Sequence, residues 1–300
     1  MKKLFSLVLV GLLAFGAGTA QAKMQVLATT TMSADLARQV GGDAVDVKGL
    51  MGVGVDPHLY QASAGDVKAL MNADVVLVHG LHLEGKMGDI FARLENQGKG
   101  VINLEKGLDK AQLLADEDHA DLYDPHIWFD PSLWAQEARY LGGELARLDP
   151  DNADGYQARA DAYAKTLEEK KAQWSQELSV IEPQARVLVT AHDAFRYFGR
   201  AFGFEVRGLQ GVSTEAEAST ADVSELAQFM AERKIKALFI ESSVPPKNVQ
   251  ALQAAVKSQG FDVALGGELY SDSLGDADHG TDTYISTVQA NIDAIVKALK

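Results

Sequence analysis

The chain has 300 residues, with 42 Asp and Glu against 28 Lys and Arg, and no cysteine. Its formal net charge of −14 disfavours binding to nucleic acid or anionic membranes and mildly favours cations. Because no disulfide or thiolate ligand is available, any metal ligands must come from His, Asp and Glu.

Residues 1–22 have the features of a signal peptide. Lys2 and Lys3 precede an apolar run over residues 4–18, and Ala20-Gln21-Ala22 is an Ala-x-Ala cleavage site. The run is too short and too rich in glycine for a membrane span. Since a lipid-anchored exported protein needs a cysteine at its cleavage site, we expect a mature protein that is free in the periplasm.

Residues 23–148 are predicted to form an N-terminal α/β lobe. Helical segments are expected at residues 32–40 and 65–71, the second with Ser63 as its N-cap. Alternating strands and helices are typical of parallel sheets flanked by helices. The expected strands are residues 24–28, 45–49, 75–78 and 100–103.

Residues 149–180 are predicted to form one long linking helix. Between Pro150 and Pro183 the chain is rich in Ala, Glu, Lys and Gln and contains no proline. About thirty helical residues would span roughly 45 Å, so we expect a rigid helix that joins two lobes. Apolar residues recur there at helical spacing: Tyr156, Ala160, Tyr163, Leu167, Trp174 and Leu178.

Residues 181–300 repeat the α/β pattern and are predicted to form a C-terminal lobe. Each lobe is long enough for a hydrophobic core of its own. The last strand is expected to end before Gly266 and Gly267, which would belong to a connection. The expected strands are residues 186–190, 204–208, 237–241 and 262–265.

Three histidines and one aspartate lie in four loops that follow predicted strands. His58 and His126 each end an Asp-Pro-His tripeptide, in which proline restricts the chain ahead of the imidazole. His192 and Asp272 follow strands of the second half, and ligands of open α/β sheets bind beyond the carboxyl ends of strands. Three imidazoles and one carboxylate form a four-coordinate set suited to zinc or a similar divalent ion.

Four longer motifs carry a resemblance to a known family. They are Val-Thr-Ala-His-Asp-Ala-Phe-Arg-Tyr-Phe from Val189, Gly-Leu-Gln-Gly-Val-Ser-Thr-Glu from Gly208, Phe-Ile-Glu-Ser-Ser from Phe239 and Gly-Glu-Leu-Tyr-Ser-Asp from Gly267. Over essentially the whole mature chain, the sequence resembles the solute-binding proteins of zinc/manganese ABC importers, and the TroA-like group most of all.

The resemblance implies a fold, a site and a function. The fold is two α/β lobes joined by one long helix, with a metal ion buried between them. The function is capture of that ion and its delivery to an ABC importer permease by a monomer that is not an enzyme. The family's ligand positions are matched by His58, His126, His192 and Asp272.

The third ligand bears on the choice of metal. Relatives of the manganese type usually carry Glu where this chain has His192, and more imidazole favours zinc over manganese. We therefore expect Zn²⁺, with Mn²⁺ next. The dedicated zinc group often has a long His-rich loop before the second ligand, whereas residues 113–124 are short and acidic. This loop is a solvated loop or a weak accessory site formed by Glu117, Asp118, His119 and Asp121.

Several other polar residues have two interpretations. His79 and His82 are a ligand pair or part of a turn at Gly80, and His279 lies in a Gly/Asp-rich loop that is expected to be exposed. Asp56 and Asp124 would cap turns or brace the loops. Ligating imidazoles usually donate their second N–H to a carboxylate or carbonyl, for which the candidates are Glu215, Glu217 and Glu241.

Two other functions compete with metal capture. A zinc-dependent hydrolase would keep three protein ligands and an open position for water, but no His-Glu-x-x-His, Gly-x-Ser-x-Gly or phosphate-loop motif is present. A binding protein for a small organic solute or metal chelate would need a larger, aromatic-lined pocket. The candidates for its lining are Tyr60, Trp128, Phe195 and Tyr197.

Overall fold

The computed structural model describes residues 22–117, 119 and 121–300. The signal-peptide prediction therefore lies outside the described residues, except for Ala22. In the described part of the chain, no helix is both long enough and apolar enough to cross a membrane.

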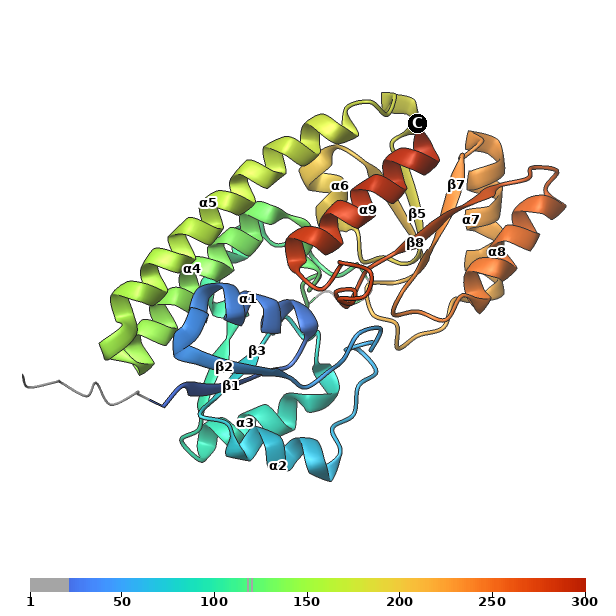
Figure 1. Cartoon of the computed structure of the whole chain (residues 1–300). Helices are drawn as coiled ribbons and strands as arrows, with labels where there is room; N and C mark the ends of the chain where they lie inside the picture. Colours follow the sequence, from blue (N-terminus) through green and yellow to red (C-terminus); the bar gives the residue numbers. More distant parts are fainter. Residues whose placement is uncertain (1–21, 118, 120) are drawn as a thin grey trace, which may run out of the picture.

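The first half is a parallel sheet with helices on both faces (Figure 1). The strands run in the order β2-β1-β3-β4 and coincide with the four predicted ranges. Ser63 caps α2 as predicted, because its side chain accepts a hydrogen bond from the Asp66 N–H. The elements are β1 (Met24–Ala28), α1 (Thr31–Gly41), β2 (Val45–Gly49), α2 (Ala64–Asn72), β3 (Val75–Val78), α3 (Gly88–Asn96) and β4 (Gly100–Asn103).

The second half contains two parallel strand pairs, β5-β6 and β7-β8, and β5 lies against β7. The strand β8 extends beyond its predicted end and contains Gly266 and Gly267. A Cβ on Gly266 would lie 2.5 Å from the Phe239 ring, so this glycine permits a close approach to β7 and does not form a turn. The elements are β5 (Val187–His192), α6 (Arg196–Phe202), β6 (Glu205–Gln210), α7 (Thr220–Arg233), β7 (Ala237–Glu241), α8 (Lys247–Ser258), β8 (Ala264–Leu269) and α9 (Tyr284–Leu299).

A pair of helices joins the two halves. The predicted linking helix is α5 (Ala153–Leu178), about 39 Å long, and it begins after a 3-10 turn at Pro150–Asn152. It packs along α4 (Pro131–Leu148) and contacts α1 and α9, one from each half. All six predicted apolar positions of α5 are buried. The remaining 3-10 turns are Gly42–Ala44, Gly85–Met87, Leu104–Gly107, Lys110–Gln112, Ile127–Phe129 and Pro183–Ala185.

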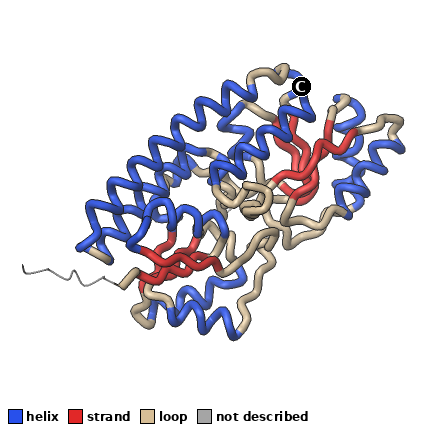
Figure 2. The backbone as a smooth tube through the Cα atoms, in the orientation of Figure 1, coloured by secondary structure: helices blue, strands red, loops and turns tan. Residues whose placement is uncertain are grey.

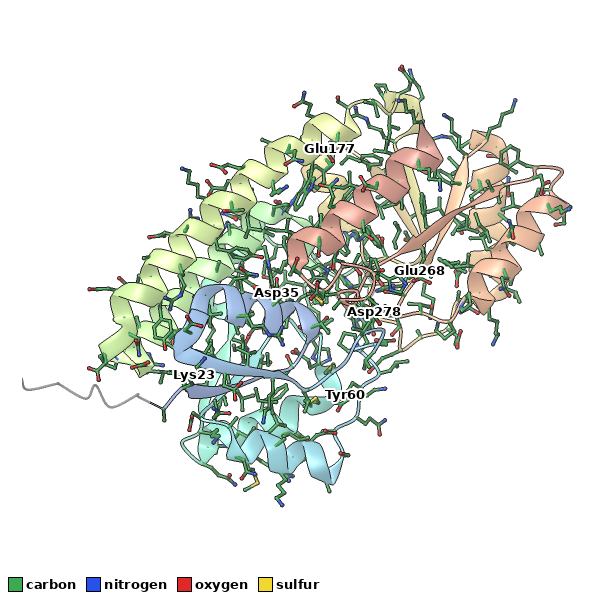
Figure 3. The ribbon with its side chains drawn as sticks, in the orientation of Figure 1. Lys23, Asp35, Tyr60, Glu177, Glu268 and Asp278 are labelled. Carbon is green, nitrogen blue, oxygen red and sulfur yellow. The ribbon has the colours of Figure 1, made fainter. Side chains whose placement is uncertain are left out.

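The largest hydrophobic cluster is shared by the two halves, and each half also has a smaller cluster of its own. One cluster of buried apolar side chains includes Val26 on β1, Trp174 on α5 and Ile292 on α9. Polar contacts reinforce it: Asp35 on α1, labelled in Figure 3, accepts a hydrogen bond from the Tyr284 N–H at the start of α9. Two smaller clusters cover the outer faces of the sheets. Loops gather between the sheets, as Figure 2 shows.

Candidate metal centre

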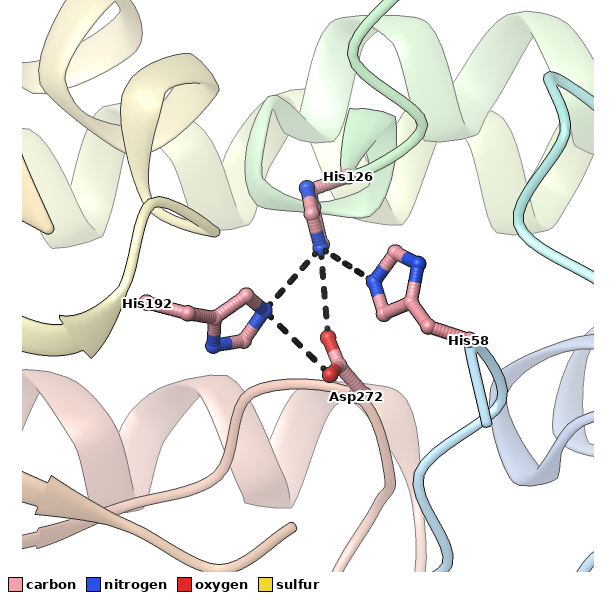
Figure 4. Close-up of side chains that lie close together, drawn as sticks. All are labelled: His58, His126, His192 and Asp272. Carbon is pink, nitrogen blue, oxygen red and sulfur yellow. Dashed lines mark hydrogen bonds and ion pairs between the residues drawn. The ribbon is translucent and has the colours of Figure 1, made fainter. Parts of the chain in front are cut away.

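The structure brings His58, His126, His192 and Asp272 together among these central loops, with His192 at the end of β5 (Figure 4). One ligand atom from each lies within 4.8 Å of the others, and all four residues are buried. The His126 Nε2 atom lies 3.4 Å from the Nε2 of His58 and 3.3 Å from that of His192. The Asp272 Oδ1 and Oδ2 atoms each lie 3.3 Å from an imidazole Nε2.

These separations match a tetrahedral shell around a zinc-sized ion. Ligand atoms placed 2.0–2.1 Å from Zn²⁺ at tetrahedral angles are ~3.3 Å apart. A neutral imidazole that donates from Nδ1 has a free lone pair on Nε2, and here the three Nε2 atoms and a carboxylate converge. The group can therefore coordinate a divalent ion without a change of fold.

The two Asp-Pro-His tripeptides hold the main chain of their histidines in the same way. The Asp56 Oδ1 atom accepts a hydrogen bond from the His58 N–H at 2.9 Å. The Asp124 Oδ1 atom accepts one from the His126 N–H at 2.9 Å and also lies 2.8 Å from the His126 Nδ1. Asp56 and Asp124 thus brace the loops, as predicted, and Asp124 also orients a ring.

The other two side chains lie at or beyond the carboxyl ends of strands in the second half. His192 is the last residue of β5, and its Nδ1 lies 2.6 Å from the Oε2 of Glu241, the last residue of β7. Asp272 follows β8 by three residues, and the Ser243 hydroxyl donates to its Oδ2 at 3.3 Å. Of the three glutamates considered as partners, only Glu241 contacts one of these imidazoles; Glu215 pairs with Lys86, and Glu217 accepts from Asn248.

The carboxylates favour protonated imidazoles at two of the three positions. Burial alone lowers the pKa of His126, but Asp124 and Asp272 outweigh it and raise that pKa to about 9. The pKa of His192 is raised well above its usual value because Glu241 and Asp272 also outweigh burial. Burial lowers the pKa of His58 to about 3. Protons therefore compete with a divalent cation at His126 and His192.

The remaining histidines lie apart from this group. The His79 Nε2 atom lies 2.8 Å from the Pro125 carbonyl oxygen, so His79 supports the loop of His126. Leu81 and His82 have positive φ angles, which confirms a turn, and His82 is exposed. His279 is exposed, as predicted, and pairs with Asp276. The role of His79 was missed because Pro125 is distant in sequence.

The acidic loop forms no second metal group among the residues that the structure describes. His119 pairs with Asp116 at 3.3 Å, and Glu117 pairs with Arg196 at 2.8 Å. Asp121 is exposed. Asp118 lies outside the described residues.

The candidate aromatic residues do not line a solute pocket. Trp128 packs against the His126 ring, and the Tyr197 hydroxyl donates to the Asp124 carbonyl oxygen. Phe195 packs on Phe129, and Tyr60 donates to Asp66. The cavity that touches His58 has a volume of about 100 Å³, well below the roughly 300–1,000 Å³ of small-molecule sites. A groove of about 1010 Å³ over β6 and α7 contains none of these aromatic residues.

Comparisons with known proteins agree on one family. A family model described as the periplasmic component A of a zinc-uptake complex (ZnuA) matches residues 26–298. The zinc-binding protein TroA of Treponema pallidum is 47% identical over 288 residues, which cover 95% of this chain and 92% of TroA. The manganese-binding lipoprotein MntA of Bacillus subtilis is 42% identical over 282 residues, 94% of this chain and 92% of MntA.

A more distant relative and a solved structure extend this similarity. The metal ABC transporter substrate-binding lipoprotein FimA of Streptococcus parasanguinis is 27% identical over 304 residues, which cover 99% of this chain and 96% of FimA. A solved structure of T. pallidum TroA matches with a TM-score of 0.88 over 93% of this chain and 99% of that TroA chain.

Proposed function

This chain belongs to the ZnuA family of periplasmic zinc-uptake proteins, and we propose that it captures a divalent transition-metal ion and delivers it to an ABC importer permease. The proposed ligands are His58, His126, His192 and Asp272. The observation that carries the proposal is their convergence, because four buried ligand atoms lie within 4.8 Å of one another and the pairs His126–His58, His126–His192, His126–Asp272 and His192–Asp272 are only 3.3–3.4 Å apart.

Zinc is the favoured cargo and manganese the next. Three imidazoles and one carboxylate suit Zn²⁺ better than Mn²⁺, which prefers oxygen ligands. The relatives support both ions, since TroA is named for zinc and MntA for manganese. Both oxygens of Asp272 face imidazoles, so a bidentate carboxylate could supply the fifth donor that a larger ion would need.

The protein binds its metal as cargo and is not an enzyme. Four protein ligands leave no open position for the water of a catalytic zinc site. The relatives that match almost the whole chain are named as metal-binding proteins or transporter components. We propose that it acts as a monomer, because one chain supplies the whole ligand set.

We further propose that residues 23–148 and 181–300 act as two lobes, joined by residues 149–180, with the ion between them. Residues 1–22 would direct export to the periplasm and then be removed. The lipid anchor implied by the names of MntA and FimA needs a cysteine, and this chain contains none. That absence favours a mature protein without a lipid anchor.

Elemental analysis of protein purified from its own host tests the identity of the cargo. We expect one Zn²⁺ per chain, and titration of the metal-free protein should show one tight site. His126→Ala should lose most of the zinc affinity while its circular dichroism stays native. The matched control is His279→Ala, a substitution of an exposed histidine that should leave the zinc affinity unchanged. Unchanged zinc affinity in His126→Ala would show that the proposed site is wrong.

A further inference from the structure

The loop that carries His58 is hydrogen-bonded to the opposite half of the protein. Residues 50–63 connect β2 to α2, and two of their bonds cross to the second half. The Gly54 N–H donates to the Ser273 Oγ at 2.8 Å, and the Thr214 Oγ1 donates to the Asp56 Oδ2 at 2.6 Å. The position of this loop therefore depends on contact between the two halves.

Asp56 links the second of these bonds to His58. Its Oδ1 accepts from the His58 N–H, and its Oδ2 accepts from the Thr214 hydroxyl. Thr214 is 7% exposed, so little water competes for this bond. Hydrogen bonds to a charged carboxylate are stronger than neutral ones. One carboxylate thus holds the main chain of His58 against Thr214.

Thr214 belongs to a segment that forms a wall of the cavity beside His58. Val212, Ser213 and Glu215 line this cavity of about 100 Å³ together with His58. His126, His192 and Asp272 are absent from its lining. Residues 211–215 form the Gly-Val-Ser-Thr-Glu part of a motif that supplies no proposed ligand. The bond from Thr214 to Asp56 keeps this wall against the loop of His58.

His58 also differs from the other two imidazoles in how its ring is held. Carboxylates pair with the Nδ1 atoms of His126 and His192. No such pair is found for the His58 ring among the described residues; Asp56 holds its main chain instead. His58 is therefore the proposed ligand whose position depends most on the contact between the halves.

We propose that the hydrogen bond from Thr214 to Asp56 is a latch that holds residues 211–215 over His58 and sets how fast the metal ion enters and leaves. The latch rests on the proposed function, because it acts on the exchange of the captured ion. When it opens, the wall moves away from His58, and that imidazole can leave the ion while His126, His192 and Asp272 still hold it. Thr214 and Asp56 are positioning residues and do not touch the ion.

The test compares three threonine variants by stopped flow. Zn²⁺ release from each holoprotein is followed with excess chelator, and Zn²⁺ uptake is followed with the metal-free protein. Thr214→Val removes the hydroxyl but keeps the shape, and Thr214→Ser keeps the hydroxyl. The matched control is Thr31→Val, because the Thr31 Oγ1 accepts a hydrogen bond from the Leu274 N–H across the same two halves, and this bond involves neither Thr214 nor Asp56.

In Thr214→Val, we expect Zn²⁺ release to be about tenfold faster. This is the size of effect expected when one hydrogen bond to a charged group is lost. Uptake should also be faster, so that the equilibrium Kd changes less than either rate. Thr214→Ser and Thr31→Val should keep the parental rates. In an Asp56→Ala background, Thr214→Val should add no further acceleration.

Three results would overturn the latch. Parental rates in Thr214→Val would show that the bond does not limit exchange. Faster release with unchanged uptake would show loss of ligand geometry instead of gating, and equal acceleration in Thr31→Val would show general loosening of the two halves. Failure of the parent protein to bind Zn²⁺ or Mn²⁺ would overturn the proposed function as well, whereas tight binding with any of the three results rejects the latch alone.

Discussion

The Nδ1 atom of His192 lies 2.6 Å from the Oε2 of Glu241, while the His192 N–H donates to the Oε1 of the same carboxylate at 2.8 Å. Both residues are buried at the ends of the adjacent strands β5 and β7. The glutamate therefore fixes both the main chain and the ring of a proposed ligand. Its charge also raises the basicity of the imidazole, so that the ring binds a metal ion more strongly.

Removing that charge should weaken zinc binding. In Glu241→Gln, we expect a loss of affinity of roughly 10–100-fold, as for other partners of metal-bound imidazoles. Competition titration against a chelator of known affinity measures it. Glu217→Gln, a change on the exposed surface, should have no effect. Parental affinity in Glu241→Gln would show that the contact is structural only.

The third ligand should set metal preference. His192→Glu replaces an imidazole with a hard anionic oxygen, so the ratio of zinc to manganese affinity should fall by at least about tenfold. Because the new carboxylate would lie near Glu241 and Asp272, adding Glu241→Gln should recover affinity for both ions by relieving repulsion. An unchanged ratio in direct competition would place the selectivity elsewhere.

Metal binding should release protons even above neutral pH. Because the pKa of His126 is raised to about 9 and that of His192 is raised well above its usual value, we expect both imidazoles to carry a second proton in the metal-free protein at pH 7.5. Because coordination requires neutral rings, about two protons should leave per Zn²⁺. Calorimetry in buffers of different ionisation enthalpy counts them.

This proton count also gives the direction of the pH dependence. Apparent affinity should decline as pH falls from about 9, well above the reference imidazole pKa of roughly 6.5. Asp124→Asn should lower the pKa of His126 and so reduce the number of protons released per Zn²⁺ from about two towards one. A count of zero at pH 7.5 would contradict the protonated pair.

A buried carboxyl group on α4 should make stability depend on pH. Both carboxyl oxygens of Glu137 lack a hydrogen-bond partner among the described residues. Burial, followed by the nearby Glu84 and Glu105, raises the pKa of Glu137 well above its usual value. Since the Glu137 carboxyl group ionises at lower pH in the unfolded chain than in the folded protein, the folded state becomes less stable as pH rises above about 4.5.

Glu137→Gln removes this titration. The free energy of unfolding of the variant should therefore rise relative to that of the parent, by up to about 1.4 kcal/mol per pH unit, between pH 5 and the pKa of Glu137 in the folded protein. Urea unfolding at pH 5, 6 and 7 measures the difference. Glu169→Gln, an exposed change on α5, should not show the trend. If the difference in free energy of unfolding between Glu137→Gln and the parent stayed constant across these pH values, a raised pKa of Glu137 would be excluded.

The connection between the halves predicts little change in overall shape when metal binds. The shared apolar cluster and the pairing of α4 with α5 resist wide separation of the two halves. Small-angle scattering profiles with and without Zn²⁺ should nearly superimpose, although zinc at a hundredfold excess over its Kd should stabilise the fold by about 2.7 kcal/mol. A large expansion of the metal-free protein would refute this rigidity.

The sequence alone determined the elements with strong local signals. The four strands of the first half coincide with their predicted ranges, because each is a short apolar or β-branched segment flanked by turn residues. The apolar spacing of α5 likewise predicts its buried face. The Asp-Pro-His tripeptides were recognisable because each aspartate bonds a main-chain N–H only two residues away.

Only the tertiary structure decided which distant groups meet. Glu241 contacts His192 because β5 lies against β7, whereas Glu215 lies at the surface, and no local pattern separates the two glutamates. The same holds for β8, whose glycines are explained by the Phe239 ring on the neighbouring strand. Periodicity and capping report contacts within a few residues, but the bond from Thr214 to Asp56 spans 158 positions and exists only once both halves have packed around the shared core.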